Sequence, residues 1–314
     1  MEDRENLILR EVTGEGSATE TDGHALTKSA RRLLLVSLTA IVCLGIVLPA
    51  AILEDRLPYP VAVVVSEYPK KPIKGIEDAE VVYEWIEWDG STSLLVVFTR
   101  RPRSDVGPLG PMWVGTAHLA YSCGNVVCGT TLPEADELSR SQEYPLSTIS
   151  GVNGDYIAPG RLVARMKEQR YRVVPEEGHL VHRGMLKVEG NHAPAVVGRR
   201  NDGAEVFRWT WDGRCYQREV GDARVRVSSL VVLHTGGGHD ECGSFPDGFF
   251  VMDGGRAVVF ARGQRVEASW SRLSPTAPVR LEKDGLGQIS LPQGRLWFHI
   301  VTSDSACEVV AGED

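Results

Sequence analysis

Residues 33–53, LLLVSLTAIVCLGIVLPAAIL, contain no charged side chain and separate the first 32 residues from the rest of the chain. A bilayer core is spanned by roughly 20 apolar residues of helix, which this segment supplies. Arg31 and Arg32 precede it, whereas Glu54 and Asp55 follow it. Because basic residues stay on the cytoplasmic side, we predict a single-pass protein of the cell membrane with a cytoplasmic N-terminus and extracytoplasmic main domains.

A cleaved signal peptide is the alternative for this segment, since its LPAA sequence offers small residues for a cleavage site. The long hydrophilic leader, residues 1–32, favours an uncleaved anchor. Its low apolar content predicts a disordered cytoplasmic tail. Cys43 has Val42 before it and an apolar run after it, so we expect a buried residue of the span and no lipidation.

Size and charge exclude several classes of protein. The chain has 314 residues, 42% of them hydrophobic, which suits two folded domains after a linker at residues 54–60. Asp and Glu number 42 against 34 Lys and Arg, and no basic stripe is interleaved with aromatics. A nucleic-acid partner is therefore not expected. No Walker or Rossmann glycine motif occurs, so no cofactor is predicted.

Residues 61–197 alternate between apolar runs and short helical patterns. VAVVVSE (61–67), LLVVFTR (94–100) and GNVVCGTT (124–131) are typical of buried strands. PGRLVARMKEQRYRV begins with Pro159, which suits a first helical turn, and repeats apolar residues at helical spacing. We therefore predict a mixed α/β first extracytoplasmic domain.

Residues 198–314 have almost no helical periodicity. In EVFRWTWDGRCYQREV (205–220) aromatic residues alternate before an Asp-Gly turn, which is a hairpin signature. Further short strands follow, separated by glycine turns. We predict a mostly antiparallel β second domain, and hence an α+β fold class for the whole chain.

Residues 79–98, AEVVYEWIEWDGSTSLLVVF, carry Glu84 and Glu87 among aromatic and branched aliphatic side chains. Buried charge is costly unless it is paired or hydrogen-bonded. On a strand, positions three apart point to opposite faces, which separates the two carboxylates unless a bulge intervenes. A helix would instead place them on one acidic ridge, but the β-branched and aromatic content and the Asp-Gly turn favour a hairpin.

A catalytic pair of carboxylates needs both groups on one side of a cleft, about 5 to 10 Å apart. Glu84 with Glu87 is the candidate catalytic pair on this criterion. Because strand geometry opposes it, a structural role for both acids at the end of the hairpin is the favoured interpretation.

Three tryptophans of the second domain, Trp209, Trp211 and Trp270, are the candidate ligand-binding residues, because flat rings can stack on sugars or peptides. Tryptophans at alternate strand positions more often belong to a core, and this remains the competing interpretation. In the first domain, Cys123 and Cys128 are the nearest cysteines outside the span and the candidate disulfide. Buried thiols are the alternative.

The loop sequence HTGGGHDECG contains four residue types that bind metals: His234, His239, Asp240 and Cys242. Their spacing matches no zinc pattern, and no second ligand cluster accompanies them. No metal site is predicted.

The order of several segments resembles the YerB-like family of bacterial envelope proteins, a domain of unknown function (DUF3048) with N- and C-terminal modules. The similar segments include PVAVVVSEYPKKPIKGIEDAEVVYEWIEWDGSTSLLVVF (60–98), VGPLGP (106–111), and the series from FRWTWDGRCYQR (207–218) to GRLWFHIV (294–301). The resemblance covers most of residues 60–301. It implies a two-module fold outside the membrane.

This chain departs from that family where relatives carry basic residues. Ser93 stands where an arginine is common, and residues 110–114, GPMWV, replace an arginine-containing loop. Ala158, Pro159, Gly160 and Arg161 replace an Ala-Pro-His-Asn segment. If those residues form a site in relatives, this chain has lost much of it.

Two functions are consistent with these observations. The first is a non-enzymatic, membrane-anchored protein that binds a cell-wall polymer or another envelope protein. The second is a cell-wall-directed hydrolase that uses Glu84, with Glu87, as acid and base. The absence of a recognisable catalytic motif favours the binding protein.

Overall fold

The computed structural model describes residues 36–37, 56–86, 91–121, 123, 125–133, 136–137, 147–168, 184, 190–200, 203–235, 253–274, 277–302 and 307–312. The chain divides into two compact units, Met1–Leu53 and Glu54–Asp314, and the folded core lies in the second. The predicted span, residues 33–53, lies outside the described residues except for Val36 and Ser37. In the described ranges no helix has the length and apolar character to cross a membrane.

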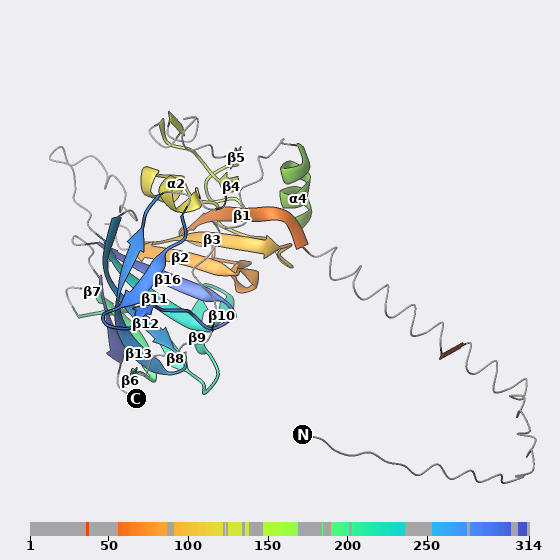
Figure 1. Ribbon diagram of the computed structural model, residues 1–314. Helices are drawn as coiled ribbons and strands as arrows, with labels where there is room; N and C mark the ends of the chain where they lie inside the picture. The colour runs from red at the N-terminus through yellow and green to blue at the C-terminus, as the bar shows by residue number, and fades with distance from the viewer. Residues whose placement is uncertain are drawn as a thin grey trace, which may run out of the picture. The chain divides into compact units, whose positions relative to one another are not determined.

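The second unit is mostly β (Figure 1). Its first part contains β1 (Arg56–Ser66), η1 (Ile76–Asp78), β2 (Val81–Ile86), β3 (Thr92–Arg100), α2 (Val114–Ala120), β4 (Asn125–Cys128), β5 (Ser147–Ser150), α4 (Pro159–Glu168), β6 (Asn191–His192) and β7 (Ala195–Arg200). Its second part contains β8 (Glu205–Trp211), β9 (Tyr216–Val220), β10 (Ala223–Val227), β11 (Ser229–Thr235), β12 (Asp253–Ala261), β13 (Gln264–Arg272), β14 (Arg280–Lys283), β15 (Gly287–Gln288), β16 (Leu296–Thr302) and β17 (Cys307–Gly312).

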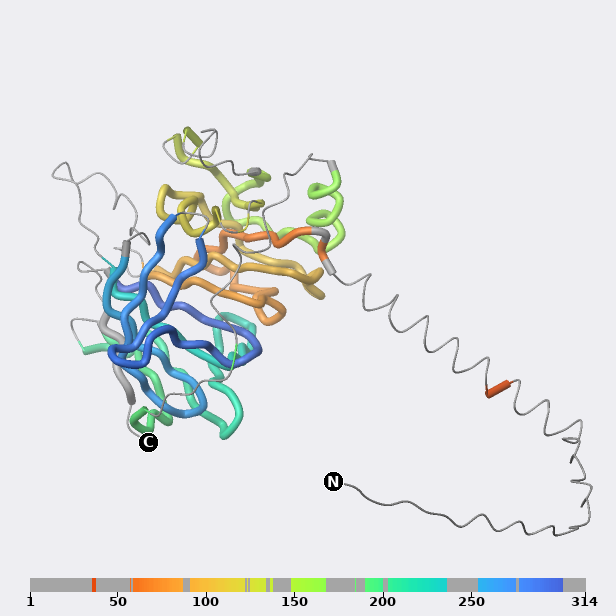
Figure 2. Tube along the Cα trace, viewed as in Figure 1, coloured from red at the N-terminus to blue at the C-terminus, as the bar shows by residue number. Residues whose placement is uncertain are grey.

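The larger sheet is mixed and has the strand order β15-β14-β13-β12-β11-β16-β2-β3-β1-β4-β5, with β6 paired to β13. Strand β16 runs parallel to both β11 and β2. The blue trace of β16 therefore runs beside the orange trace of β2 (Figure 2). The two segments predicted as separate domains thus share one sheet.

The second sheet is antiparallel, with the order β10-β9-β8-β7-β17. It contains the predicted hairpin, in which β8 pairs with β9 around an Asp-Gly turn. Oδ1 of Asp212 accepts hydrogen bonds from the backbone N–H groups of Arg214 and Cys215, and Gly213 takes a positive φ of 92°. The antiparallel prediction for residues 198–314 is correct for most of these strands, whereas β16 with its two parallel neighbours departs from it.

Alternating side chains give the larger sheet two buried faces. One face packs against the five-stranded sheet and against α4, whose Leu162 and Met166 point inward at the predicted helical spacing. The other face packs against α2. Helix therefore contributes less to this unit than the predicted α/β description of its first part implies, because a second sheet covers much of the first.

Candidate functional site

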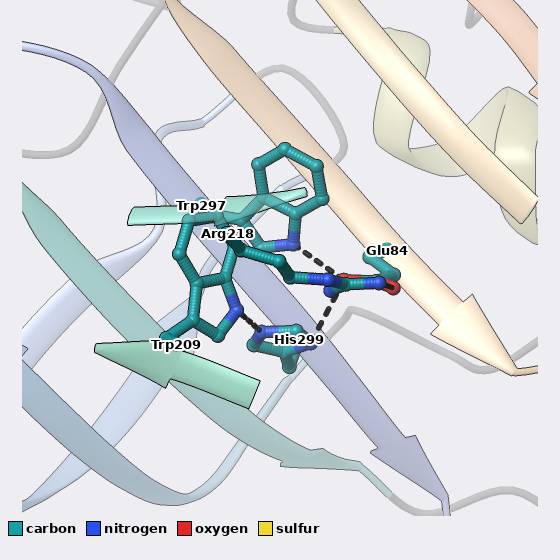
Figure 3. Close-up of polar contacts among 5 residues, drawn as sticks. All are labelled: Glu84, Trp209, Arg218, Trp297 and His299. Atoms are coloured by element: carbon teal, nitrogen blue, oxygen red, sulfur yellow. Dashed lines mark hydrogen bonds and ion pairs between the residues drawn. The ribbon is translucent and has the colours of Figure 1, made fainter. Parts of the chain in front are cut away.

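The most concentrated set of polar groups in the core surrounds Glu84, where the two sheets face each other (Figure 3). In the parallel pairing of β16 with β2, His299 is aligned with Glu84. Trp297 shares this face of β16, because it lies two positions from His299. The opposite sheet supplies Trp209 from β8 and Arg218 from β9. We call these five residues the Glu84 cluster.

The carboxylate of Glu84 accepts four interactions. Its Oε1 lies 2.9 Å from Nη2 of Arg218. Its Oε2 lies 2.8 Å from Nη1 of Arg218, 2.6 Å from Nε1 of Trp297 and 3.1 Å from Nδ1 of His299. Three of these contacts fall on Oε2 and one on Oε1, so the protein itself engages both carboxylate oxygens.

The imidazole of His299 has a defined tautomer, because each ring nitrogen has one partner. Nε1 of Trp209 donates to Nε2 of His299 over 3.0 Å, so this nitrogen is an acceptor. The ring proton must then reside on Nδ1, which donates to Glu84. His299 is therefore a neutral ring that links the indole of one sheet to the carboxylate of the other.

Aromatic rings enclose the guanidinium of Arg218. Its Cζ lies 4.6 Å from the ring centroid of Phe207, 5.6 Å from that of Trp209 and 5.8 Å from that of Trp297. Phe207 also stacks on His299, with centroids 4.2 Å apart. The bidentate ion pair with Glu84 thus sits in an apolar surround, where both charge attraction and desolvation are large.

Burial alone would raise the pKa of Glu84, but the charge of Arg218 and the hydrogen bonds of the cluster outweigh it and hold that pKa well below its usual range. Burial lowers the pKa of His299, although the neighbouring carboxylate opposes this effect. At neutral pH the cluster therefore contains one anion, one cation and one neutral imidazole.

These properties do not suit acid/base catalysis. Glu84 is 1% exposed and His299 is 3% exposed, so neither group reaches solvent. A general acid also needs a pKa near the working pH, whereas that of Glu84 is lowered. The arrangement is that of a structural ion pair which joins the two sheets. The predicted partner, Glu87, lies outside the described residues.

A basic residue in place of Ser93 would not have been the charge partner of Glu84. The β2–β3 register pairs Ser93 with Trp85, which places its side chain on the opposite face of the sheet from Glu84. There its hydroxyl lies 3.0 Å from that of Ser66. The basic residue that pairs with Glu84 comes instead from the second sheet.

The predicted tryptophan platform is not present as an exposed surface. Trp209 is fully buried in the Glu84 cluster, and Trp270 is buried and donates to the backbone oxygen of His234. Trp211 is half-buried against Tyr216, with ring centroids 5.0 Å apart. Trp209 and Trp211 face the larger sheet, whereas Trp270 lies in the core on the other face of that sheet.

The candidate disulfide is also not formed. Cys128, at the end of β4, is a buried free thiol 3.5 Å from Oγ1 of Thr131. Burial raises its pKa, which keeps it a thiol. Of the four candidate metal ligands, His234 lies at the end of β11, while His239, Asp240 and Cys242 lie outside the described residues.

The loop at residues 107–112 does not meet Glu84. Its backbone pairs with Ser66 and Lys74, and its Leu109 lines a pocket at the β4–β5 edge of the sheet. Arg161, from the segment that departs from the family pattern, lines the same pocket. This loop and Glu84 therefore do not form one site.

Sequence reasoning missed Arg218 and His299. The sequence did indicate that Arg218 points into the core, because this residue alternates with Tyr216 and Val220 on the buried face of β9. A charged side chain at a core position requires a buried partner. For His299 the surrounding LWFHIV run placed the ring in a buried strand, but nothing local indicated its partner.

Comparisons with known proteins found one family model and one solved structure similar to this chain. The family model described as the C-terminal domain of a protein of unknown function (DUF3048) matches residues 197–298. A crystal structure of the YerB protein from Bacillus subtilis matches with a TM-score of 0.66 and 19% sequence identity, over 82% of this chain and 94% of that one. Among curated proteins nothing matches. Residues 197–298 are thus similar to the DUF3048 C-terminal domain, and the chain shares the fold of YerB, in line with the sequence resemblance.

Proposed function

We propose that this chain is a membrane-anchored extracytoplasmic protein that binds a component of the cell envelope and performs no chemistry at Glu84. The solvent-excluded, ion-paired carboxylate carries the proposal, because the acid that looked most catalytic is buried and both of its oxygens have partners within the protein. The charge-free residues 33–53, followed by the folded unit, support the anchor.

The alternative, a hydrolase that uses Glu84 and Glu87, has less support. Glycoside hydrolysis requires two carboxylates that flank a bound substrate. Glu84 instead lies between two sheets and faces Arg218. A binding surface elsewhere on the fold requires no such group, and for this reason we favour binding.

The topology can be tested with tags at either end of the full chain. On intact cells, added protease is expected to remove a C-terminal tag and to leave an N-terminal tag untouched, because the basic residues before the span hold that end in the cytoplasm. Permeabilised cells are the control, in which both tags should be cut. An N-terminal tag that is cut on intact cells would contradict the orientation, and an N-terminal tag absent from the mature chain would indicate cleavage.

A further inference from the structure

A small pocket lies beside the first turns of α4, at the edge of the larger sheet formed by β4 and β5. Its volume is about 70 Å³. Buried apolar side chains line its interior, namely those of Leu109, Val127, Ile149 and Ile157. One water needs about 10 to 15 Å³ by this measure, so the pocket has room for a compact polyatomic group.

Two arginines of α4 line this pocket from the same side. Arg161 and Arg165 are four positions apart, so they are neighbours on one helix face. Arg161 is exposed, and within the described part of the chain no hydrogen bond or ion pair holds it. Its guanidinium is therefore available to a ligand.

The surroundings add positive charge. A Cβ placed on Gly160 would lie 3.7 Å from Nη2 of Arg101, so a third guanidinium lies close to the first turn of α4. The N-terminal end of α4 also carries the positive end of the helix dipole. Among the lining residues that the structure describes, Asp155 is the one carboxylate, and it is exposed. In this described lining the two arginines outnumber the one acid.

We infer that this pocket binds one phosphate group of an envelope ligand, with Arg161 as the binding residue and Arg165 as a neighbouring positive charge. A guanidinium fork engages two oxygens, which are all that a carboxylate has, whereas a phosphate keeps further oxygens for the charge of Arg165. The group enters the pocket and the rest of the ligand stays outside. The phosphate site itself follows from the pocket, and the envelope origin of the ligand rests on the proposed function.

The test is calorimetric titration of the full chain in detergent with glycerol 3-phosphate, inorganic phosphate and acetate. Glycerol 3-phosphate is expected to bind saturably and at least as tightly as inorganic phosphate, and acetate is expected to bind more weakly. Arg161→Gln should weaken binding about tenfold or more, since it removes charge-assisted hydrogen bonds. Arg165→Gln should weaken binding less, since it removes a neighbouring positive charge. Asp155→Asn should tighten binding, because it removes the opposing charge.

Arg224→Gln is the matched control. Arg224 is an exposed arginine on β10 and should leave binding unchanged. Glutamine is a good helix former, and unchanged far-ultraviolet circular dichroism would show that the α4 variants fold. Absent binding by the wild type, or equal binding by Arg161→Gln, would overturn the site. Equal binding of acetate would overturn the choice of phosphate, and binding of inorganic phosphate alone would overturn the esterified ligand.

The two proposals fail separately. A chain that is anchored with its main unit outside, yet binds no phosphate probe, refutes the pocket and leaves the proposed function standing. A chain whose main unit lies on the cytoplasmic side, yet binds glycerol 3-phosphate through Arg161, keeps the site and refutes the envelope origin of its ligand.

Discussion

Replacement of Arg218 by Met is expected to lower the free energy of unfolding by about 3–5 kcal/mol at pH 7, because it leaves the carboxylate of Glu84 buried without its cation. Met retains an unbranched side chain of similar reach, so the packing against Phe207 and the tryptophans changes less than the charge does. Urea unfolding followed by tryptophan fluorescence measures the difference.

Arg224→Met is the matched control for this variant. Arg224 is exposed on the neighbouring strand β10 and donates to Gln217, so its loss should cost less than about 0.5 kcal/mol. Addition of Glu84→Gln to Arg218→Met should recover part of the loss, since no unpaired charge remains in the core. A cost below about 1 kcal/mol for Arg218→Met would mean that the ion pair does not hold the sheets together.

Replacement of Trp209 by Ala should cost about 3–5 kcal/mol. The indole is fully buried, lies 5.0 Å from the ring of Trp297 in an edge contact and donates to His299. Its removal opens a cavity between the sheets and leaves the Nε2 acceptor of His299 unsatisfied. Thermal and urea unfolding report this loss.

Trp211→Ala provides the comparison on the same strand. Trp211 faces the same way but is only half-buried, and it has no partner in the Glu84 cluster. We expect it to cost less than half as much as Trp209→Ala. Equal costs would contradict the assignment of Trp209 as the central ring of the core.

Local patterns predicted most of the strands. The β-branched and aromatic content of residues 81–86 indicated β2, and its antiparallel pairing with β3 confirms the predicted hairpin. The Asp-Gly turn likewise predicted the β8–β9 hairpin, and apolar spacing after Pro159 predicted α4. In each case the residues that carry the pattern belong to the element itself or to its turn, where the sequence directly determines the local geometry.

The Glu84 cluster could not be predicted this way, because its members are far apart along the chain. Arg218 is 134 positions from Glu84, and Trp297 is 213 positions from it. Their meeting depends on the parallel placement of β16 beside β2 and on the packing of the two sheets. Periodicity assigns a residue to a face of a strand but does not say which strand lies opposite.

The tryptophans show the same limit in another form. Alternation placed Trp209 and Trp211 on one face of a strand, and an exposed platform and a core have identical spacing. Only the presence of the larger sheet over that face decides between them. The sequence likewise did not show whether Ser93, which differs from the family pattern, faces Glu84. The β2–β3 register shows that it faces away.

The most direct test of the structural role of Glu84 is the pH dependence of unfolding for the wild type and Glu84→Gln. The folded-state pKa of Glu84 lies below the ordinary value of 4.5, so the ionised carboxylate stabilises the fold above about pH 4.5. That contribution is lost as the pH falls from there toward the lower folded-state pKa. Glutamine does not titrate and lacks the contribution throughout.

We therefore expect Glu84→Gln to be less stable than the wild type by about 1.5–3 kcal/mol at pH 7. The difference should shrink steadily as the pH falls below about 4.5, and the variant should remain associated with the envelope as the wild type does. A variant as stable as the wild type at every pH, which nevertheless lost a function of the protein in the envelope, would show that Glu84 acts in chemistry and would contradict this account.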